Sequence, residues 1–222
     1  MASRNLIASG RKIVAIGRNF SEHAKELGNA VPKTPFFFLK PTSSYISNGQ
    51  SIEVPTGCEV HHEVELGVVI GKDGRDIPAS QAESHVAGYT LALDMTARNL
   101  QDAAKKAGLP WSAAKGYDTF TPIGDLIPKD SIPDTNNVDL SLKIDGVTKQ
   151  NGNTKDMIFK VPMLIEYVSS IMKLQAGDVI LTGTPAGVGP VKPGETVTCE
   201  LGTKGTILSQ LRFPVVARPN KP

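Results

Sequence analysis

The fold of this sequence is restricted most strongly by its short apolar or alternating runs. Prolines and glycines separate these runs along the whole chain. The 16 prolines and 21 glycines are spread over 222 residues instead of being gathered in one linker. Turns this frequent leave room for strands of about four to eight residues but for few long helices. The pattern therefore predicts one compact domain that is rich in β-strands.

The strand pattern recurs throughout, whereas helical periodicity is confined to a few segments. Strands are predicted at residues 12–17, 35–40, 51–54, 63–71, 89–96, 138–150, 178–183 and 195–213, with Asp145-Gly146 as a hairpin turn. Apolar spacings of three and four predict helices at 97–108 and 161–172, with weaker signals at 78–86 and 21–28. Because strands outnumber helices and do not alternate with them, a mixed β fold with peripheral helices is expected rather than a Rossmann or TIM-barrel arrangement.

The charge and the cysteines limit the classes of function. With 24 Lys and Arg against 22 Asp and Glu, the net charge of +2 gives no reason to expect nucleic acid or an anionic membrane as partner. No apolar run approaches the roughly 20 residues that cross a bilayer. Cys58 and Cys199 are far apart and no CxxC motif is present, so a reducing compartment fits better than a disulfide framework or a zinc ribbon. The opening segment lacks the apolar core of a signal peptide, so secretion is not expected.

Two glutamates share one face of a predicted strand. In the segment HHEVELG at 61–67, Glu63 and Glu65 are two positions apart, so their side chains project to the same side, about 6.6–7 Å apart at Cα. The next predicted strand is apolar until Asp94, a carboxylate that is costly to bury unless it is paired or bound to metal. Together the three would form an all-oxygen site suited to Mg²⁺ or Mn²⁺. The alternative is that the glutamates line a solvated sheet face and Asp94 pairs with Arg98.

Two further segments contain groups that could move a proton or stabilise a charge. If residues 21–28 are helical, His23 and Glu26 lie on one face, where the carboxylate can orient the imidazole as in a general-base pair. The alternative is an ordinary surface pair. Lys115 lies among small and aromatic residues, where a partly desolvated ammonium could stabilise an oxyanion. Otherwise its stem packs on Trp111 and its head reaches water.

The segment LTGTPAGVGP at 181–190 is rich in glycine and follows a predicted strand. It lacks the terminal Gly-Lys-Ser/Thr of a phosphate-binding loop, and Pro185 and Pro190 prevent a clean helix start, so a nucleotide site is not expected. The backbone amides and the hydroxyls of Thr182 and Thr184 could instead bind a carboxylate. Equally, the segment could be a tight loop that only shapes a cavity.

Five segments, taken in order, resemble those of the fumarylacetoacetate hydrolase superfamily: HHEVELGVVIG, LALDMTARNLQ, GLPWSAAKGYDTFTPIG, IFKVP and GDVILTGTPAGVGPVK. The similarity runs from about Lys12 to Phe213. It is strongest to the small fumarylacetoacetate hydrolase domain-containing type, which is acylpyruvase-like or oxaloacetate tautomerase-like. The resemblance implies a β-roll, with an N-terminal extension at 1–11, a single catalytic domain at 12–216 and a tail at 217–222.

The resemblance also implies roles for individual residues. Glu63, Glu65 and Asp94 are expected to hold Mg²⁺ or Mn²⁺, His23 and Glu26 to form a catalytic dyad on a lid, and Lys115 to act as an active-site lysine. The family lines its substrate pocket at the positions of Arg18, Lys40, Arg98, Gln101 and Thr184. Phe20 stands where the family often has a tyrosine, which leaves the catalytic set intact.

The implied activity is that of a metal-dependent enzyme acting on small 2-oxo dicarboxylic or 2,4-dioxo acids through a metal-stabilised enolate. Oxaloacetate keto–enol tautomerisation is the first expectation, because a proton transfer requires fewer catalytic groups than bond cleavage. Acylpyruvate hydrolysis and oxaloacetate decarboxylation are the alternatives. The rival from another class is a non-catalytic metabolite-binding protein. The resemblance further implies a homodimer in the mitochondrial matrix, with the cytoplasm as the alternative location.

Overall fold

One sheet of eight strands forms the centre of the computed structural model, which describes residues 10–22 and 32–219. The strands follow the order β2, β1, β13, β6, β7, β9 and β3, and β10 pairs with β7. Their bounds are β1 (Ile13–Ile16), β2 (Phe37–Lys40), β3 (Tyr45–Ser47), β6 (Val64–Ile70), β7 (Val86–Leu93), β9 (Thr121–Ile123), β10 (Ile127–Pro128) and β13 (Val179–Leu181). Most neighbours are antiparallel, but β1 runs parallel to β13 and β3 runs parallel to β9.

Alternate residues of this sheet belong to two separate cores. In β6, Val68 belongs to the larger core of the molecule, whereas Val69 belongs to a smaller cluster with residues of β1, β7, β9 and β13. Phe38 of β2 and Tyr45 of β3 pack in the same small cluster, although these two strands end the path of the sheet. The sheet therefore curls around the cluster, which confirms the predicted β-roll. Glu65 lies on the same side of β6 as Val69, so its carboxylate faces the inside of the roll.

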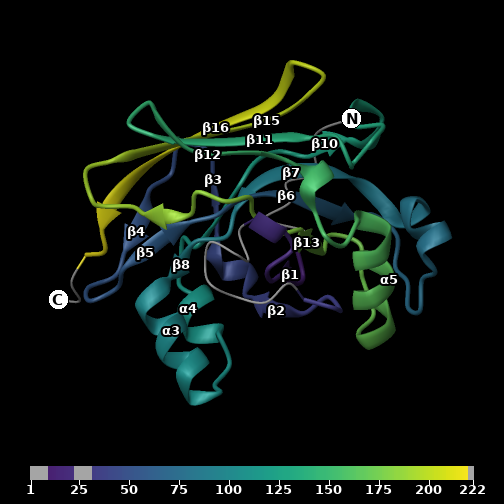
Figure 1. Ribbon diagram of the computed structural model, residues 1–222, viewed down its shortest axis with the longest axis horizontal. Coiled ribbons are helices and arrows are strands. Elements are labelled where there is room, and N and C mark those ends of the chain that lie inside the picture. Colours follow the sequence, from purple (N-terminus) through teal and green to yellow (C-terminus); the bar gives the residue numbers. More distant parts are fainter. Residues whose placement is uncertain (1–9, 23–31, 220–222) are drawn as a thin grey trace.

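A second sheet of five strands packs against the roll, where β11 and β16 contact β6 and β7 (Figure 1). Its order is β12, β11, β15, β16 and β4, with bounds β4 (Ile52–Val54), β11 (Asp139–Ile144), β12 (Val147–Asn153), β15 (Thr196–Thr203) and β16 (Thr206–Ala217). The predicted hairpin turn lies between β11 and β12, and Asp145 and Gly146 have φ of 48° and 82°, as this two-residue turn requires. Three short strands form a third sheet: β5 (Val60–His62), β8 (Thr96–Ala97) and β14 (Gly189–Pro190).

The helices lie at the periphery of these sheets, as predicted (Figure 1). They are α3 (Arg98–Ala107), α4 (Ser112–Lys115) and α5 (Val161–Ile171), and 3₁₀ helices span Thr42–Ser44, Ala79–His85, Lys129–Ser131 and Thr154–Asp156. Helix α3 ends at Gly108, whose φ of 66° closes the last turn. None of the helices in the described ranges is long and apolar enough to cross a membrane.

The weaker helical signals have different outcomes. The segment predicted as a helix at 78–86 forms a 3₁₀ helix, because its buried residues Ala82 and His85 are three positions apart and match a three-residue repeat. Of the helix predicted at 21–28, the first two residues are described and are helical. The rest of that segment lies outside the described residues.

Candidate active site

Three buried carboxylates converge where β6 begins and β7 ends. Glu63 directly follows β5, Glu65 lies in β6, and Asp94 directly follows β7. Glu65 is opposite Ala92 in the antiparallel pair, so Asp94, two positions further on, lies on the same face. One oxygen from each carboxylate lies within 4.8 Å of the other two. The structure thus brings together Glu63, Glu65 and Asp94, the three residues that the strand pattern predicted to form one site. We call them the acidic cluster.

Buried cations surround the acidic cluster. The Lys115 ammonium donates hydrogen bonds to Glu63 Oε2 at 2.9 Å and to Asp94 Oδ2 at 2.6 Å. Lys40 donates to the other oxygen of Asp94, and Arg98 donates to Glu63 Oε1 at 2.5 Å. Three cations therefore lie against two of the three carboxylates, Glu63 and Asp94, which explains how their charge is buried inside one roll.

These contacts correct the alternatives that the sequence left open. Asp94 does not pair with Arg98, because α3 begins at Arg98 and directs its guanidinium to Glu63. The Lys115 head does not reach water beyond Trp111, since the residue is 2% exposed and its ammonium lies within the acidic cluster. Nor do the glutamates line a solvated face, because both are buried.

The predicted substrate-binding residues lie around the same site. A small pocket over the acidic cluster is lined by Ile16, Gly17, Arg18, Phe38, Arg98, Gln101, Lys105, Trp111, Lys115 and Thr184. Lys40 is fully buried behind the cluster, held by Asp94. Arg18 has a φ of 55°, a costly conformation for a residue with a side chain, and its guanidinium stacks 5.6 Å from the Phe36 ring. His23 and Glu26 lie outside the described residues.

The loop after β13 contributes backbone contacts to the site. The sequence left open whether its amides bind a carboxylate or the loop only shapes a cavity, and in the structure the Gly183 N–H donates to the Glu65 side chain at Oε2, at 2.7 Å. Gly183 has a φ of 99°, and a Cβ atom there would lie 2.8 Å from that of Asn19. Glycine is therefore the residue that both the backbone angle and the close approach allow. The Thr182 hydroxyl is directed away from ligands, because it donates to the Leu66 carbonyl at 3.0 Å.

The buried charges shift the pKa values in opposite directions. Burial raises the pKa of Glu65 well above 4.5, and the nearby carboxylates of Asp94 and Glu63 raise it further. Burial alone would lower the pKa of Lys115, but the attraction of Asp94 and Glu63 is stronger, so its pKa is raised above 10.5. Lys115 is therefore charged at neutral pH, and the Glu65 carboxyl keeps its proton to a higher pH than an ordinary glutamate when no cation is added.

Metal affinity should rise with pH up to the raised pKa of Glu65. A metal displaces the proton of a carboxyl that it binds, so about one proton should be released per ion below that pKa. The window in which the affinity rises therefore lies below the raised pKa of Glu65, and the affinity should level off above it. Calorimetric titration with Mn²⁺ in buffers of different ionisation enthalpy measures the released protons. Constant affinity without proton release throughout the window would contradict the role of Glu65 as a ligand.

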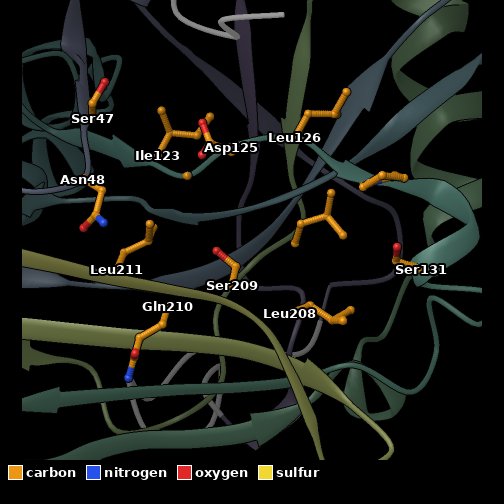
Figure 2. A pocket seen from close by; sticks show the side chains of 13 residues that line it. Ser47, Asn48, Ile123, Asp125, Leu126, Ser131, Leu208, Ser209, Gln210 and Leu211 are labelled. Atoms are coloured by element: carbon orange, nitrogen blue, oxygen red, sulfur yellow. The ribbon is translucent and has the colours of Figure 1, made fainter. Parts of the chain in front are cut away.

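A larger groove, of about 570 Å³, lies away from the acidic cluster, between β16 and the segment that joins β9 to β10 (Figure 2). Among the described residues that line it, Asp125 is the one charged side chain, and there is no histidine or cysteine. The described residues form a single group able to hold a metal, which is the acidic cluster. The candidate active site is therefore identified by the side chains that can bind a metal, and not by the volume of the pocket.

Comparison with known proteins places this site in a family. Residues 12–215 match the family described as fumarylacetoacetate (FAA) hydrolase C-terminal, so the chain belongs to the fumarylacetoacetate hydrolase family. The oxaloacetate decarboxylase, mitochondrial, of Dictyostelium discoideum is 58% identical over 212 residues, which are 95% of this chain and 96% of that protein. The oxaloacetate tautomerase FAHD1, mitochondrial, of Arabidopsis thaliana is 57% identical over 216 residues, 97% of this chain and 95% of that one.

A solved structure of a relative contains both a metal and a small oxo acid. It is fumarylpyruvate hydrolase from Pseudomonas aeruginosa in complex with Mn²⁺ and pyruvate. The TM-score is 0.86 at 36% sequence identity, covering 94% of this chain and 91% of the other. The family thus includes a member of the same fold that binds a divalent cation and a 2-oxo acid.

Proposed function

We propose that this chain is a divalent-metal-dependent oxaloacetate keto–enol tautomerase, and that the acidic cluster holds Mg²⁺ or Mn²⁺. The observation that carries the proposal is the convergence of three buried carboxylates in a chain 57% identical to a tautomerase. The other relative is named a decarboxylase, so decarboxylation of oxaloacetate remains an alternative, as does acylpyruvate hydrolysis.

The residues present fit a hard divalent cation. The acidic cluster offers only carboxylate oxygens, which Mg²⁺ and Mn²⁺ prefer. The pKa of Glu65 is raised first by burial and then by the negative charge of Asp94 and Glu63, and an added cation would offset both effects. When bound, such an ion supplies Lewis-acid chemistry, which polarises the oxygens of a 2-oxo acid and favours its enolate.

The side chains around the cluster suit a small dicarboxylate. Arg18 and Lys105 bring positive charge to the lining of the pocket, where they can bind the carboxylates of the substrate. The Lys115 ammonium is held in place by two carboxylates and can stabilise an oxyanion without reorganising. Gln101 accepts a hydrogen bond from Arg98 at 2.6 Å, which leaves its amide hydrogens available to a ligand.

Tautomerisation requires one proton to leave C3 and one to reach the oxygen on C2, while the double bond moves from C2–O to C2–C3. We assign this transfer to His23 with Glu26 as its orienting carboxylate, and this assignment rests on the resemblance of the segment 17–28 to the family's lid. The same resemblance supports a catalytic domain at 12–216 and a homodimer. The names of the relatives include the word mitochondrial, which supports a location in the mitochondrial matrix.

A parallel assay on enol-oxaloacetate, keto-oxaloacetate and acetylpyruvate tests the proposal. We expect conversion of the enol to the keto form with Mg²⁺ or Mn²⁺, its loss in EDTA, and its return when metal is added back. Pyruvate appearing faster than the tautomers interconvert would put decarboxylation or hydrolysis first. Binding of oxaloacetate without any turnover would favour the metabolite-binding protein, and full activity in metal-free protein would overturn the metal site.

A further inference from the structure

A buried amide on β12 connects the five-stranded sheet to the acidic cluster. Gln150 is 0% exposed, and every hydrogen-bonding position of its side chain is used. Its Oε1 lies 3.1 Å from the Val64 nitrogen and 2.9 Å from His62 Nδ1. Its Nε2 donates to Thr184 Oγ1 and to the Pro185 carbonyl, both at 2.8 Å. One side chain thus joins β5, β6 and the loop after β13.

The point of attachment lies between two residues of the acidic cluster. Val64 stands between Glu63 and Glu65, and both of its backbone polar groups are engaged by this network. Its N–H donates to Gln150 Oε1, and its carbonyl accepts a hydrogen bond from Thr184 Oγ1 at 2.8 Å. These bonds fix the two peptide planes on either side of Val64, which connect it to Glu63 and to Glu65. The backbone between Glu63 and Glu65 is therefore held by the Gln150 amide and the Thr184 hydroxyl.

The network also determines where its protons lie. Because Gln150 Oε1 accepts from the Val64 N–H and an amide oxygen cannot donate, His62 must donate to it from Nδ1. The Thr184 hydroxyl accepts from Gln150 and donates to Val64. Toward the pocket Thr184 is left with a lone pair, so it accepts a hydrogen bond from a ligand instead of donating one.

Close backbone packing holds β12 in the position that this network needs. A Cβ atom at Gly187 would lie 2.1 Å from the Lys149 carbonyl oxygen, and one at Gly152 would lie 2.5 Å from Pro185. Gly187 also has a φ of 95°. Glycine at both places lets the loop after β13 lie directly on β12.

We propose that Gln150 is a positioning residue, which aims the carboxylates of Glu63 and Glu65 and makes Thr184 a hydrogen-bond acceptor toward the ligand. The inference rests on the proposed function, because it takes the acidic cluster as a metal site. Partners that orient metal ligands typically contribute 10–100-fold to metal affinity. The role is testable through metal binding itself, without any measurement of turnover.

The test compares Mn²⁺ affinity in two isosteric variants of the same hairpin region. Gln150→Met removes the amide, whereas Thr154→Val removes a hydroxyl that accepts from the Val138 N–H at 2.9 Å and is equally buried. Trp111 is the single tryptophan of the chain and lines the pocket, so its fluorescence reports binding. We expect about tenfold or greater loss of Mn²⁺ affinity for Gln150→Met and less than about twofold loss for Thr154→Val.

Equal Mn²⁺ affinity in Gln150→Met and wild type would overturn the inference, and so would an equal loss in Thr154→Val at the same melting temperature. If Gln150→Met does not fold, Gln150→Asn takes its place, because it keeps an amide but shortens its reach by one methylene. The shorter variant should weaken Mn²⁺ in the same direction, and unchanged affinity would again count against the role. Failure of the wild type to bind Mn²⁺ is a separate result, which contradicts the proposed function before any variant is compared.

Discussion

Asp94→Ala should lower affinity for Mg²⁺ or Mn²⁺ by at least about tenfold and remove metal-dependent turnover. The change leaves a doubly charged ion with two carboxylates, and it leaves Lys40 with only backbone carbonyls as partners. Burial already lowers the pKa of Lys40, and Asp94 is the strongest group opposing that shift, so Lys40 should become neutral more readily. Calorimetry for the metal and the enol-oxaloacetate assay for turnover measure the two effects.

Asp130→Ala is the matched control, because Asp130 is exposed and lies outside the acidic cluster. It should leave both the affinity and the turnover within about twofold, in the range of ordinary surface substitutions. Asp94→Asn separates charge from shape, since it keeps an oxygen for one lysine. Unchanged Mn²⁺ affinity in both Asp94 variants would remove Asp94 from the ligand set.

Lys115→Met should lower kcat by about 10²–10³-fold, the cost of losing one fixed donor to an oxyanion. The ammonium is paired with both Glu63 and Asp94, so its removal also leaves two buried carboxylates less compensated. Breaking a buried pair from one side costs about 3–5 kcal/mol. The metal-free variant should therefore melt at a lower temperature, and added Mg²⁺ should restore most of the loss.

Thermal midpoint and turnover must be measured on the same preparation, with Lys106→Met as control for the loss of an exposed lysine on α3. If Lys115 only supported the fold, turnover would fall in proportion to folded protein and would recover with Mg²⁺. Near-normal kcat in a folded, metal-loaded Lys115→Met protein would rule out a role in stabilising charge.

Local pattern predicted the longer strands, because alternation and apolar runs are properties of neighbouring residues. The strands that escaped prediction, such as β3, β5 and β9, have three residues each and exist through pairing with distant segments. Likewise, the two-residue spacing of Glu63 and Glu65 placed them on one face. The ion pairs that neutralise the acidic cluster could not be predicted from such local spacing, because Lys115 lies 52 positions from Glu63 and Lys40 lies 54 positions from Asp94.

Strand β1 obtains its second partner only when most of the chain has been synthesised. It pairs with β2 on one edge, but on the other edge it runs parallel to β13. Until Val179–Leu181 have left the ribosome, Ile13 and Ala15 lack the β13 residues Val179 and Leu181 of their cluster, and the roll cannot close. Such distant pairing makes folding slow. A nascent chain with this topology stays open to chaperones, or to a protein-conducting pore, through most of its synthesis.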